Sequence, residues 1–239
     1  MKIALVILSF NEIEGVTELL PYLKDKSALK VDDIFAVDGG STDGTLEQYA
    51  KHGVRVLRQT SRGRGEAMRF ASQGSDADYL VFFSSDGNED WKDIARFREF
   101  FEAGHDLVIA SRMMRGAHNE EDGQWIRARK WVNNIFNLVA NVAFRRTGPY
   151  VTDSINGFRG MRRGLLAELG VDAMGYTVEY QTTIRSLKTG KKIMEFPTHE
   201  GARIGGETKA PSFPTGVQFL KCLWRELRAG RRVRLPVLS

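Results

Sequence analysis

Short apolar runs alternate with segments of helical periodicity over the first 111 residues, and this alternation constrains the fold more than any other feature of the sequence. The predicted strands are KIALVILS, DIFAVD, VRVLR, DYLVFFS and DLVIAS, and the predicted helices lie between them at about 12–24, 43–52, 64–73 and 91–103. Such alternation favours an α/β fold with a mostly parallel sheet covered by helices on both faces.

Polar clusters stand where the predicted strands end. SFNE follows the first strand, DGGSTDG the second, SSDGNED the fourth and SRMMRG the fifth. Because sheets of this class bind ligands beyond the carboxyl ends of their strands, we expect the functional site at this edge of the sheet.

The pattern changes after residue 111. A loop, RGAHNEEDG, leads into QWIRARKWVNNIFNLVANVAF, where apolar residues recur at helical spacing at Val132, Ile135, Val139 and Val142. Further helices are predicted near 163–169 and 178–189, and a strand at KIMEFPT. Residues 200–214 combine Gly, Pro, Ser and charge, which predicts a mobile loop or lid.

Three asparagines, Asn133, Asn137 and Asn141, form a second stripe on the same predicted helix. Asn is a poor helix former, so three of them on one face need a reason. Hydrogen bonds within the fold are the expected reason, because buried amides are usually satisfied by neighbouring groups. Ligand contacts are the alternative.

A chain of 239 residues with 42% apolar composition suits one globular domain with a small appendage. Its single cysteine, Cys222, excludes a disulfide framework and predicts a reducing, cytoplasmic setting. The apolar run from Ile3 to Leu8 is shorter than a signal-peptide core and is interpreted as the first strand. We expect no transmembrane helix, since no stretch approaches about 20 uninterrupted apolar residues.

The formal net charge of +5 is unevenly placed, since residues 201–239 carry eight Lys or Arg against two Glu. An apolar stripe in this tail is formed by Val217, Leu220, Trp224 and Leu227, and it is flanked by Lys221, Arg225, Arg228, Arg231 and Arg232. This composition is typical of an amphipathic helix on an anionic membrane surface. A helix packed on its own domain with a solvated basic face is one alternative, and docking to a separate membrane subunit is another.

The motifs after the second and third strands suggest contacts with a nucleotide. Asp38 leaves a buried strand and is well placed to accept hydrogen bonds from a nucleobase or ribose, while Ser41 and Asp43 are predicted to form the turn and to cap the next helix. RGRGEAMRFA puts glycines and arginines at a helix start, where free N–H groups favour anions. A basic, solvated first turn is the alternative interpretation of this motif.

The turn after the fourth strand holds one carboxylate, Asp86, with Ser84 and Ser85 before it and Asn88 after it. A hard cation such as Mg²⁺ needs few protein ligands when a diphosphate and water supply the remaining oxygens, so Asp86 with Asn88 could suffice. Asp90 is predicted to be the N-cap of the helix that begins at Trp91.

Six motifs, taken in order and spacing, resemble those of family 2 glycosyltransferases with a GT-A fold: ILSFNE, VDGGSTDGT, RGRGEA, SSDGNED, the DLVIASR strand and DSINGFRG. The chain most resembles dolichyl- and polyprenyl-phosphate sugar transferases, from about residue 3 to about residue 210. The resemblance implies a Rossmann-like GT-A fold. It also implies inverting transfer of a sugar from a UDP- or GDP-sugar to a polyprenyl or dolichyl phosphate at the membrane surface.

The resemblance assigns a nucleotide-sugar site residue by residue. Asn11 and Glu12 lie in the loop that walls the base and ribose, Asp38 matches the aspartate that contacts the nucleotide, and Arg64 stands where the family has a Lys near the diphosphate. The other predicted members of this site are Ser84, Ser85, Asp86 and Arg203.

A divalent cation, Mg²⁺ or Mn²⁺, is the implied cofactor. Asp86 matches the final Asp of the family's D-x-D motif, and Asn88 matches a Gln or Asn that completes the coordination. Ser84 takes the place of the first Asp, so the resemblance leaves two alternatives, a weakly bound cation and no dependence on a metal.

The acceptor site is implied by R-x-x-x-S-x-x-x-N, in which Arg129 matches the Arg and Asn133 replaces the Ser that help to bind the acceptor phosphate. Arg112 is expected to assist. Lys209 belongs with Arg203 to a loop that closes over the site, and Asp153 of DSINGFRG is the acidic residue expected to face the reaction centre.

Asp86, Arg129 and Asp153 are therefore the predicted catalytic residues. A phosphate acceptor is already anionic and needs no general base, so positioning and stabilisation of the leaving diphosphate would be the main tasks. A glycan or other hydroxyl acceptor would need a base, for which Asp153 is the candidate. A non-catalytic nucleotide-sugar-binding partner protein is the remaining alternative, raised by Ser84.

We expect a glycosyltransferase domain over residues 1–213, followed by a basic amphipathic helical tail over 214–239. Residues 1–111 would form the nucleotide-sugar-binding half of the domain and 112–213 the acceptor half. The expected partners are a nucleotide sugar, a polyprenyl-phosphate lipid and either a membrane surface or a membrane-embedded subunit, and no nucleic acid. The expected location is cytoplasmic and peripheral to the membrane.

Overall fold

The computed structural model describes residues 1–119, 128–205 and 212–233, and the side chains of all of these except residues 128, 129, 212 and 213. Seven strands within these ranges form one sheet in the order β3-β2-β1-β4-β6-β5-β7. Their bounds are β1 Ile3–Ser9, β2 Asp33–Asp38, β3 Arg55–Arg58, β4 Tyr79–Ser84, β5 Leu107–Ser111, β6 Arg159–Arg162 and β7 Ile193–Pro197. Strand β6 runs antiparallel to β4 and β5, and the other neighbouring strands pair in parallel.

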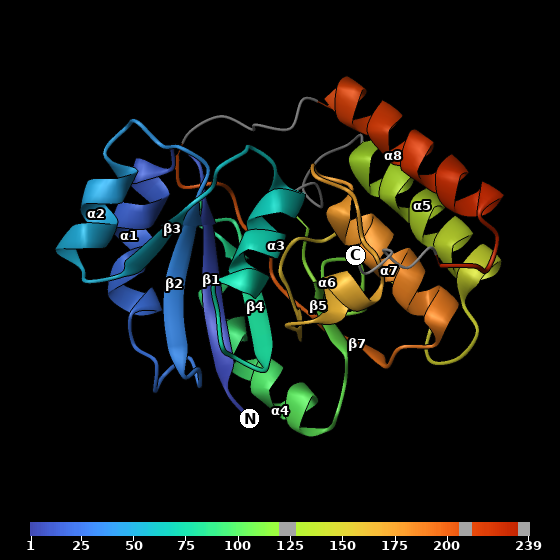
Figure 1. Ribbon diagram of the computed structural model, residues 1–239, viewed down its shortest axis with the longest axis horizontal. Coiled ribbons are helices and arrows are strands. Elements are labelled where there is room, and N and C mark those ends of the chain that lie inside the picture. Colours follow the sequence, from blue (N-terminus) through green and yellow to red (C-terminus); the bar gives the residue numbers. More distant parts are fainter. Residues whose placement is uncertain (120–127, 206–211, 234–239) are drawn as a thin grey trace.

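Helices cover both faces of this sheet (Figure 1). On one face lie α1 Ile13–Leu23, α2 Thr45–Lys51, the 3₁₀ helix η1 Trp91–Arg96 and α4 Phe97–Glu102. On the other face lie α3 Arg64–Gln73, α5 Ala128–Phe144, α6 Leu165–Glu168, α7 Val178–Thr189 and α8 Ser212–Arg228. The predicted α/β fold, mostly parallel and covered on both faces, is thereby confirmed.

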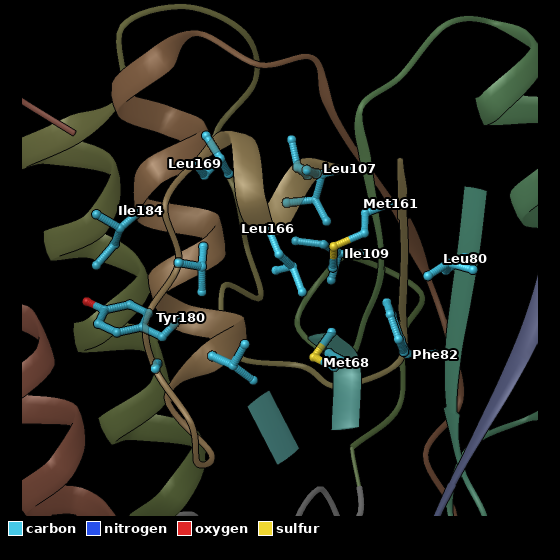
Figure 2. Close-up of a cluster of buried hydrophobic side chains, with 14 of the residues drawn as sticks. Met68, Leu80, Phe82, Leu107, Ile109, Met161, Leu166, Leu169, Tyr180 and Ile184 are labelled. Carbon is cyan, nitrogen blue, oxygen red and sulfur yellow. The ribbon is translucent and has the colours of Figure 1, made fainter. Parts of the chain in front are cut away.

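The core consists of two buried apolar clusters, one on each face of the sheet. Strand β1 contributes to both, because successive side chains of a strand point to opposite faces: Leu5 joins one cluster and Val6 the other. Figure 2 shows part of the larger cluster, where Phe82 of β4 packs near Met68 of α3. Truncating a fully buried phenylalanine such as Phe82 to alanine costs about 3–5 kcal/mol.

The strand register brings the predicted site loops together. Ser9 at the end of β1 pairs with Asp38 at the end of β2, and Leu8 pairs with Ser84 at the end of β4. The three loops that follow these strands therefore leave the same edge of the sheet, as the sequence predicts.

The predicted strands and most predicted helices agree with the structure to within about two residues at each end. The helix predicted at 91–103 is divided into η1 and α4, and Asp90 is its N-cap as predicted, with its side chain accepting the N–H of Lys92. The segment predicted for the asparagine helix is helical from Ala128 to Phe144, and its first four residues, 124–127, lie outside the described residues.

Strand β6 was not predicted, because its sequence, RGMR, has no apolar alternation. Arg159 is nonetheless fully buried, and its guanidinium donates to the carbonyl oxygens of Asn156 and Glu179 at 2.6 and 2.9 Å. Gly160 fits beneath the ring of Phe101, since a Cβ there would lie 2.5 Å from that ring. Long-range packing, rather than local pattern, thus places this strand.

The asparagine stripe of α5 is explained by hydrogen bonds within the fold. Asn137 Oδ1 accepts the N–H of Ser154 at 2.9 Å. Asn141 Oδ1 accepts the N–H of Val151 at 2.9 Å, and its Nδ2 donates to the carbonyl oxygen of the same residue. Both asparagines are buried, so they fasten α5 to the loop before β6 and the structural interpretation is confirmed for these two.

Candidate functional site

The turns after β1 and β2 are tied together by Asp38. This carboxylate is fully buried, and its Oδ1 accepts the N–H groups of Gly40 and Ser41 at 2.9 and 2.8 Å. Ser41 also donates its hydroxyl to Asp38 and accepts the N–H of Asn11 at 2.8 Å. Asp38 therefore holds the shape of this loop, and its predicted contact with a nucleotide stays a prediction.

Ser41 holds the turn, as predicted, through its N–H and hydroxyl, which both donate to Asp38. It does not cap α2, which begins at Thr45. Asp43 does bind the first N–H groups of two helices: it accepts the N–H of Thr45, at the start of α2, at 3.0 Å and the N–H of Ile13, at the start of α1, at 3.0 Å. Asn11 has a φ of 51°, a left-handed conformation that Asn tolerates, and its Oδ1 accepts the N–H of Thr42.

A first cavity of about 400 Å³ lies at the carboxyl ends of β1 and β4. Its lining includes the predicted site residues Glu12, Arg64, Ser84, Ser85, Asp86 and Arg203, whereas Asn11 and Asp38 do not line it. Phe10, Gln59 and Arg62 line it as well, and the guanidinium of Arg62 lies 4.8 Å from the centre of the Phe10 ring. None of these three residues was predicted from the sequence.

The glycines at the start of α3 allow a close approach of another loop. A Cβ on Gly65 would lie 2.0 Å from the carbonyl oxygen of Ala173, so only glycine fits. The N–H groups of Gly65 and Glu66 donate to the carbonyl oxygen of Met174 at 2.8 and 3.3 Å. These two donors are thus engaged by the protein itself and are not open to an anion. Of the two arginines in the motif, Arg62 is exposed, whereas Arg64 pairs with Glu179.

The loop after β4 is closed over by residues 200–204. Asp86 Oδ2 accepts from Arg203 Nη1 at 2.7 Å, and Arg203 Nη2 donates to Glu12 at 2.9 Å. The N–H of Ile204 donates to the carbonyl oxygen of Asp86 at 2.9 Å. The side-chain amide of Asn88 donates to Glu200 at 3.4 Å, so the two predicted metal ligands each contact this segment.

Glu89 adds a second carboxyl group beside Ser84. Its Oε2 accepts the N–H of Ser84 at 2.7 Å, and burial together with the nearby charge of Asp86 raises the pKa of Glu89 to about 8. Among the described residues, no three His, Cys, Asp or Glu side chains are grouped closely enough to hold a metal ion by themselves. A cation at Asp86 and Asn88 would therefore depend on oxygens of a bound diphosphate, as the sequence analysis expects.

A second cavity of about 860 Å³ adjoins the first, and Arg64, Ser84 and Tyr176 line both. One end is polar, with Arg112, Asn133 and Glu200 in its wall. The other end is apolar and lies between two helices: α5 contributes Val132, Ile135 and Phe136, and α8 contributes Val217, Phe219, Leu220 and Leu223.

Arg112 connects two carboxylates at the polar end. Its Nε donates to Asp153 Oδ2 at 2.8 Å, its Nη2 to Asp153 Oδ1 at 3.1 Å, and its Nη1 to Glu200 at 3.2 Å. Burial opposes its charge, but the adjacent carboxylates outweigh burial and raise the pKa of Arg112. Asp153 is fully buried behind Arg112 and lines neither cavity, so the structure does not place it among the groups that face them.

Two predicted acceptor residues lie beyond what the structure describes. Arg129 stands in the first turn of α5, one turn before Asn133, but its side chain is outside the described set. Lys209 is outside the described residues altogether. Asn133 lines the second cavity, as its predicted role requires.

The sequence analysis also missed Glu179 and Tyr176. Glu179 lies in the first turn of α7, is 2% exposed and pairs with Arg64. Its partner is 115 residues away in the sequence, so no local spacing could signal the pair. A carboxylate at a buried helix start is the one signal that the sequence offered.

Comparison with known proteins gives consistent results. A family model described as glycosyl transferase family 2 matches residues 4–170. The chain is 27% identical to glycosyltransferase AglJ of Haloferax volcanii, over 80% of this chain and 60% of that protein. It is 24% identical to the dolichol-phosphate mannosyltransferase of Pyrococcus furiosus, over 95% of this chain and 64% of that protein. The chain therefore spans less than two thirds of the length of either relative. It is 29% identical to the undecaprenyl-phosphate mannosyltransferase of Micrococcus luteus, with 87% of each chain covered.

Solved structures share the fold. The glucosyl-3-phosphoglycerate synthase of Mycobacterium tuberculosis, in complex with phosphoglyceric acid, superposes with a TM-score of 0.71 at 21% identity, covering 94% of this chain and 79% of that one. Its complex with Mg²⁺ and uridine diphosphate gives a TM-score of 0.70, covering 94% of this chain and 78% of that one. At this level of identity the likeness shows the fold alone, which is the predicted GT-A arrangement.

Proposed function

The chain belongs to glycosyl transferase family 2, and from this premise we propose that it transfers a sugar from a nucleoside diphosphate sugar to a polyprenyl phosphate at a membrane surface. The first cavity would hold the nucleotide and the second the acceptor. The acceptor class is supported by the similarity to the dolichol-phosphate and undecaprenyl-phosphate mannosyltransferases.

The observation that carries this proposal is the apolar half of the second cavity. Four residues line this cavity and are also exposed on the outer surface of α5 and α8: Val132, Ile135, Val217 and Leu220. The cavity wall is therefore continuous with an apolar surface. An isoprenoid chain could leave the polar end of the cavity along that wall, whereas a water-soluble glycan acceptor would gain nothing from it.

That outer surface, which we name the α5/α8 face, is unusually apolar. Its members are Trp131, Val132, Ile135, Leu138 and Val142 of α5 and Val217, Leu220, Trp224 and Leu227 of α8. Trp131 is 71% exposed and Val142 77% exposed. Large exposed apolar patches mark protein or membrane contacts, and Figure 1 shows the two helices side by side at the end of the molecule away from α1 and α2.

Helix α8 packs on its own domain by a different face from the one that carries the predicted apolar stripe. Phe219, Cys222 and Glu226 are buried against the domain, and Glu226 accepts from Lys188 Nζ at 2.6 Å and from Arg185 Nε at 2.9 Å. The stripe is left outward, with Trp224 60% exposed. The helix can therefore be docked on its domain and still present an apolar surface.

Charge supports a lipid surface as the partner of the α5/α8 face. Lys221 and Arg228 lie on α8 around the stripe, and the guanidinium of Arg228 lies 4.5 Å from the centre of the Trp224 ring. Arg225 lies there too, but its guanidinium pairs with Asp172 at 2.8 Å. Apolar side chains bordered by basic ones are typical of helices on anionic membranes. In the described part of the chain, no helix is both long and apolar enough to cross a bilayer. Peripheral, cytoplasmic placement is part of our proposal, and docking to a membrane-embedded subunit is the alternative.

The proposed reaction needs positioning more than proton transfer. The phosphate of the acceptor carries its own negative charge and attacks the anomeric carbon as the bond to the nucleoside diphosphate breaks. Arg112 and Asn133 would hold the nucleophile at the polar end of the second cavity. Arg203, with its guanidinium in the first cavity, would stabilise the charge of the leaving diphosphate.

The residues of the β4 loop fit a divalent cation. Asp86 and Asn88 offer a carboxylate and an amide oxygen, which are hard ligands of the kind that Mg²⁺ and Mn²⁺ take. Asp86 already faces a positive group, the guanidinium of Arg203 at 2.7 Å, so the position accommodates positive charge. When bound, the cation would supply further stabilisation of the diphosphate.

A hydroxyl acceptor with Asp153 as base receives less support from the geometry. Both oxygens of Asp153 accept from Arg112, and the carboxylate lines neither cavity. A base must reach the proton that it removes, directly or through a water. The phosphate acceptor avoids this requirement.

The test is release of nucleoside diphosphate from UDP- and GDP-sugars with Mg²⁺ or Mn²⁺, with and without a short polyprenyl phosphate. We expect release to be stimulated by the lipid and to fall at least about 100-fold in Asp86→Ala, because a charge-stabilising group is lost. Glu18→Ala, on the exposed side of α1, is the matched control. Binding of a nucleotide sugar without turnover under any condition would favour the non-catalytic partner protein.

A further inference from the structure

A buried tyrosine of α2 lies beneath the first cavity. Tyr49 is fully buried, and its ring belongs to the apolar cluster between the sheet and α1. Its hydroxyl forms a hydrogen bond with Ser9 Oγ at the end of β1. A phenylalanine would fill the same apolar space, so packing alone does not explain the hydroxyl group.

The hydrogen bonds continue from β1 to the loop after β4. Ser85 Oγ lies 3.3 Å from Ser9 Oγ and 3.1 Å from the carbonyl oxygen of Leu8. Ser9 and Ser85 are both buried, and both line the first cavity. Two serine hydroxyls therefore connect Tyr49 to the wall of that cavity.

Tyr49 is needed as a donor in this network. The hydroxyl of Ser85 has one proton but two acceptors within reach, so when it donates to Leu8 it cannot donate to Ser9. Tyr49 is then the one donor left to Ser9 Oγ among the described residues. Burial raises the pKa of Tyr49, and the nearby carboxylates of Asp38 and Glu12 add to this, so its hydroxyl keeps the proton.

The network ends at the residue before Asp86. Helix α1 packs on the same peptide, since a Cβ on Gly15 would lie 2.0 Å from the carbonyl oxygen of Ser85 and 3.2 Å from Asp86 Cα. The N–H of Ser85 also donates to the carbonyl oxygen of Leu8 at 3.3 Å. Asp86 itself lines the first cavity. A change at Ser85 would therefore move the carboxylate that follows it.

We propose that Tyr49 is a positioning residue, whose hydroxyl holds Ser9 and Ser85 so that the β4 loop presents Asp86 to a nucleoside diphosphate and its cation. The proposal rests on the proposed function, because it takes the first cavity as the nucleotide site. A hydrogen bond between neutral groups is worth about 2- to 12-fold in an equilibrium constant, so loss of the hydroxyl should weaken nucleotide binding by about fivefold.

The experiment measures the affinity of UDP and of GDP by calorimetry in the presence of Mn²⁺. The variant is Tyr49→Phe, which keeps the ring in the core. Tyr180→Phe is the matched control, because Tyr180 is also fully buried and its hydroxyl donates to the carbonyl oxygen of Phe136 at 3.1 Å, on the other face of the sheet. Each variant loses one buried hydrogen bond, so unfolding in urea measures the structural effect that the two share.

Ser85→Ala tests whether Tyr49 acts through the serine hydroxyls. Residues that act through one network give effects that do not add. The variant that combines Tyr49→Phe with Ser85→Ala should therefore bind the nucleotide no more than about twofold more weakly than the weaker of the two single variants.

We expect Tyr49→Phe to bind the nucleoside diphosphate about fivefold more weakly than the wild type, and Tyr180→Phe to bind it as the wild type does. Equal weakening in both variants, no weakening in Tyr49→Phe, or full additivity with Ser85→Ala would overturn the assignment. No lipid takes part in this experiment. The expected loss in a protein that transfers nothing to polyprenyl phosphate would thus support the positioning role and count against the proposed acceptor. If the wild type binds neither UDP nor GDP, the first cavity is not the nucleotide site and both proposals fail.

Discussion

Trp224 provides a direct test of the α5/α8 face as a membrane surface. The side chain is 60% exposed on α8, and a tryptophan buries up to about 250 Å² when fully covered, so about 150 Å² is available to lipid. At about 25 cal/mol per Å² this area is worth at most about 4 kcal/mol. Immersion of half of it would contribute about 2 kcal/mol, so Trp224→Ala should weaken binding to vesicles by about 30-fold.

Flotation with vesicles is the appropriate assay, because it reports the bound fraction of the whole protein directly. Vesicles containing phosphatidylserine should bind more protein than vesicles of phosphatidylcholine alone. The basic residues around the stripe contribute about 1 kcal/mol each near an anionic surface, and salt should reduce this difference.

Tyr22→Ala is the matched control, since Tyr22 is a 50% exposed aromatic residue on α1, at the opposite end of the molecule (Figure 1). It should bind vesicles as the wild type does. If Trp224→Ala also binds as the wild type does, or if the wild type does not bind anionic vesicles, the α5/α8 face is not a membrane surface. A soluble complex with a membrane subunit that covers Trp224 would then be the better account.

Three further predictions concern the fold that holds the site. Glu226→Ala removes a carboxylate shared by two buried cations: it leaves Lys188 without a described carboxylate partner and leaves Arg185 with the more exposed Asp172 alone. It should lower the free energy of unfolding in urea by about 3–5 kcal/mol, whereas Lys191→Ala, at a pair nearer the surface, should change it by less than about 1 kcal/mol. Gly65→Ala forces a Cβ to 2.0 Å from a carbonyl oxygen and should cost about 1–3 kcal/mol, while Gly164→Ala meets no atom within 4 Å and should stay within about 0.5 kcal/mol by the same measurement. Burial raises the pKa of Glu195 to about 7, so the folded state holds this proton more tightly than the unfolded state. Its contribution to stability is therefore greatest below about pH 4.5 and falls by up to about 3 kcal/mol as the pH rises to 7, and Glu195→Gln should flatten that slope in a series of unfolding curves. An unchanged slope in Glu195→Gln, or a mild effect of Glu226→Ala or Gly65→Ala, would contradict the packing described above.

The strands and the order of the helices were predictable because burial imposes a local pattern. β1 lies between two layers of helices, so all of its residues are apolar or small, and its sequence shows a continuous apolar run. β6 follows no such rule. Its buried Arg159 is satisfied by carbonyl oxygens from residues up to 20 positions away, which no local pattern can reveal.

The position of the candidate site was predictable because parallel strands place their carboxyl ends at one edge of the sheet. Which residues pair with one another within the site was not predictable. Arg64 with Glu179, and Asp86 with Arg203, are more than 100 residues apart in the sequence and meet through tertiary packing. Asp38 shows the opposite case, where a residue singled out for chemistry has its carboxylate engaged by its own turn.

In the C-terminal tail, the sequence pattern alone did not predict how the helix packs. The stripe that includes Leu220 and Trp224 was visible in the sequence, but amphipathic pattern alone does not say whether such a stripe faces a core or a partner. In the structure Glu226 and Cys222 turn inward instead, because the buried cations of α7 provide a partner for the carboxylate. The apolar stripe is left outside.

The central claim is that a lipid phosphate is the nucleophile, and mass spectrometry of the lipid product tests it most directly. The protein is incubated with the nucleotide sugar that it turns over, together with either a short polyprenyl phosphate or the matching polyprenol. We expect a polyprenyl phosphate that carries one added sugar on its phosphate, and no product from the polyprenol. A sugar on the polyprenol hydroxyl, or turnover that yields no modified lipid at all, would contradict it.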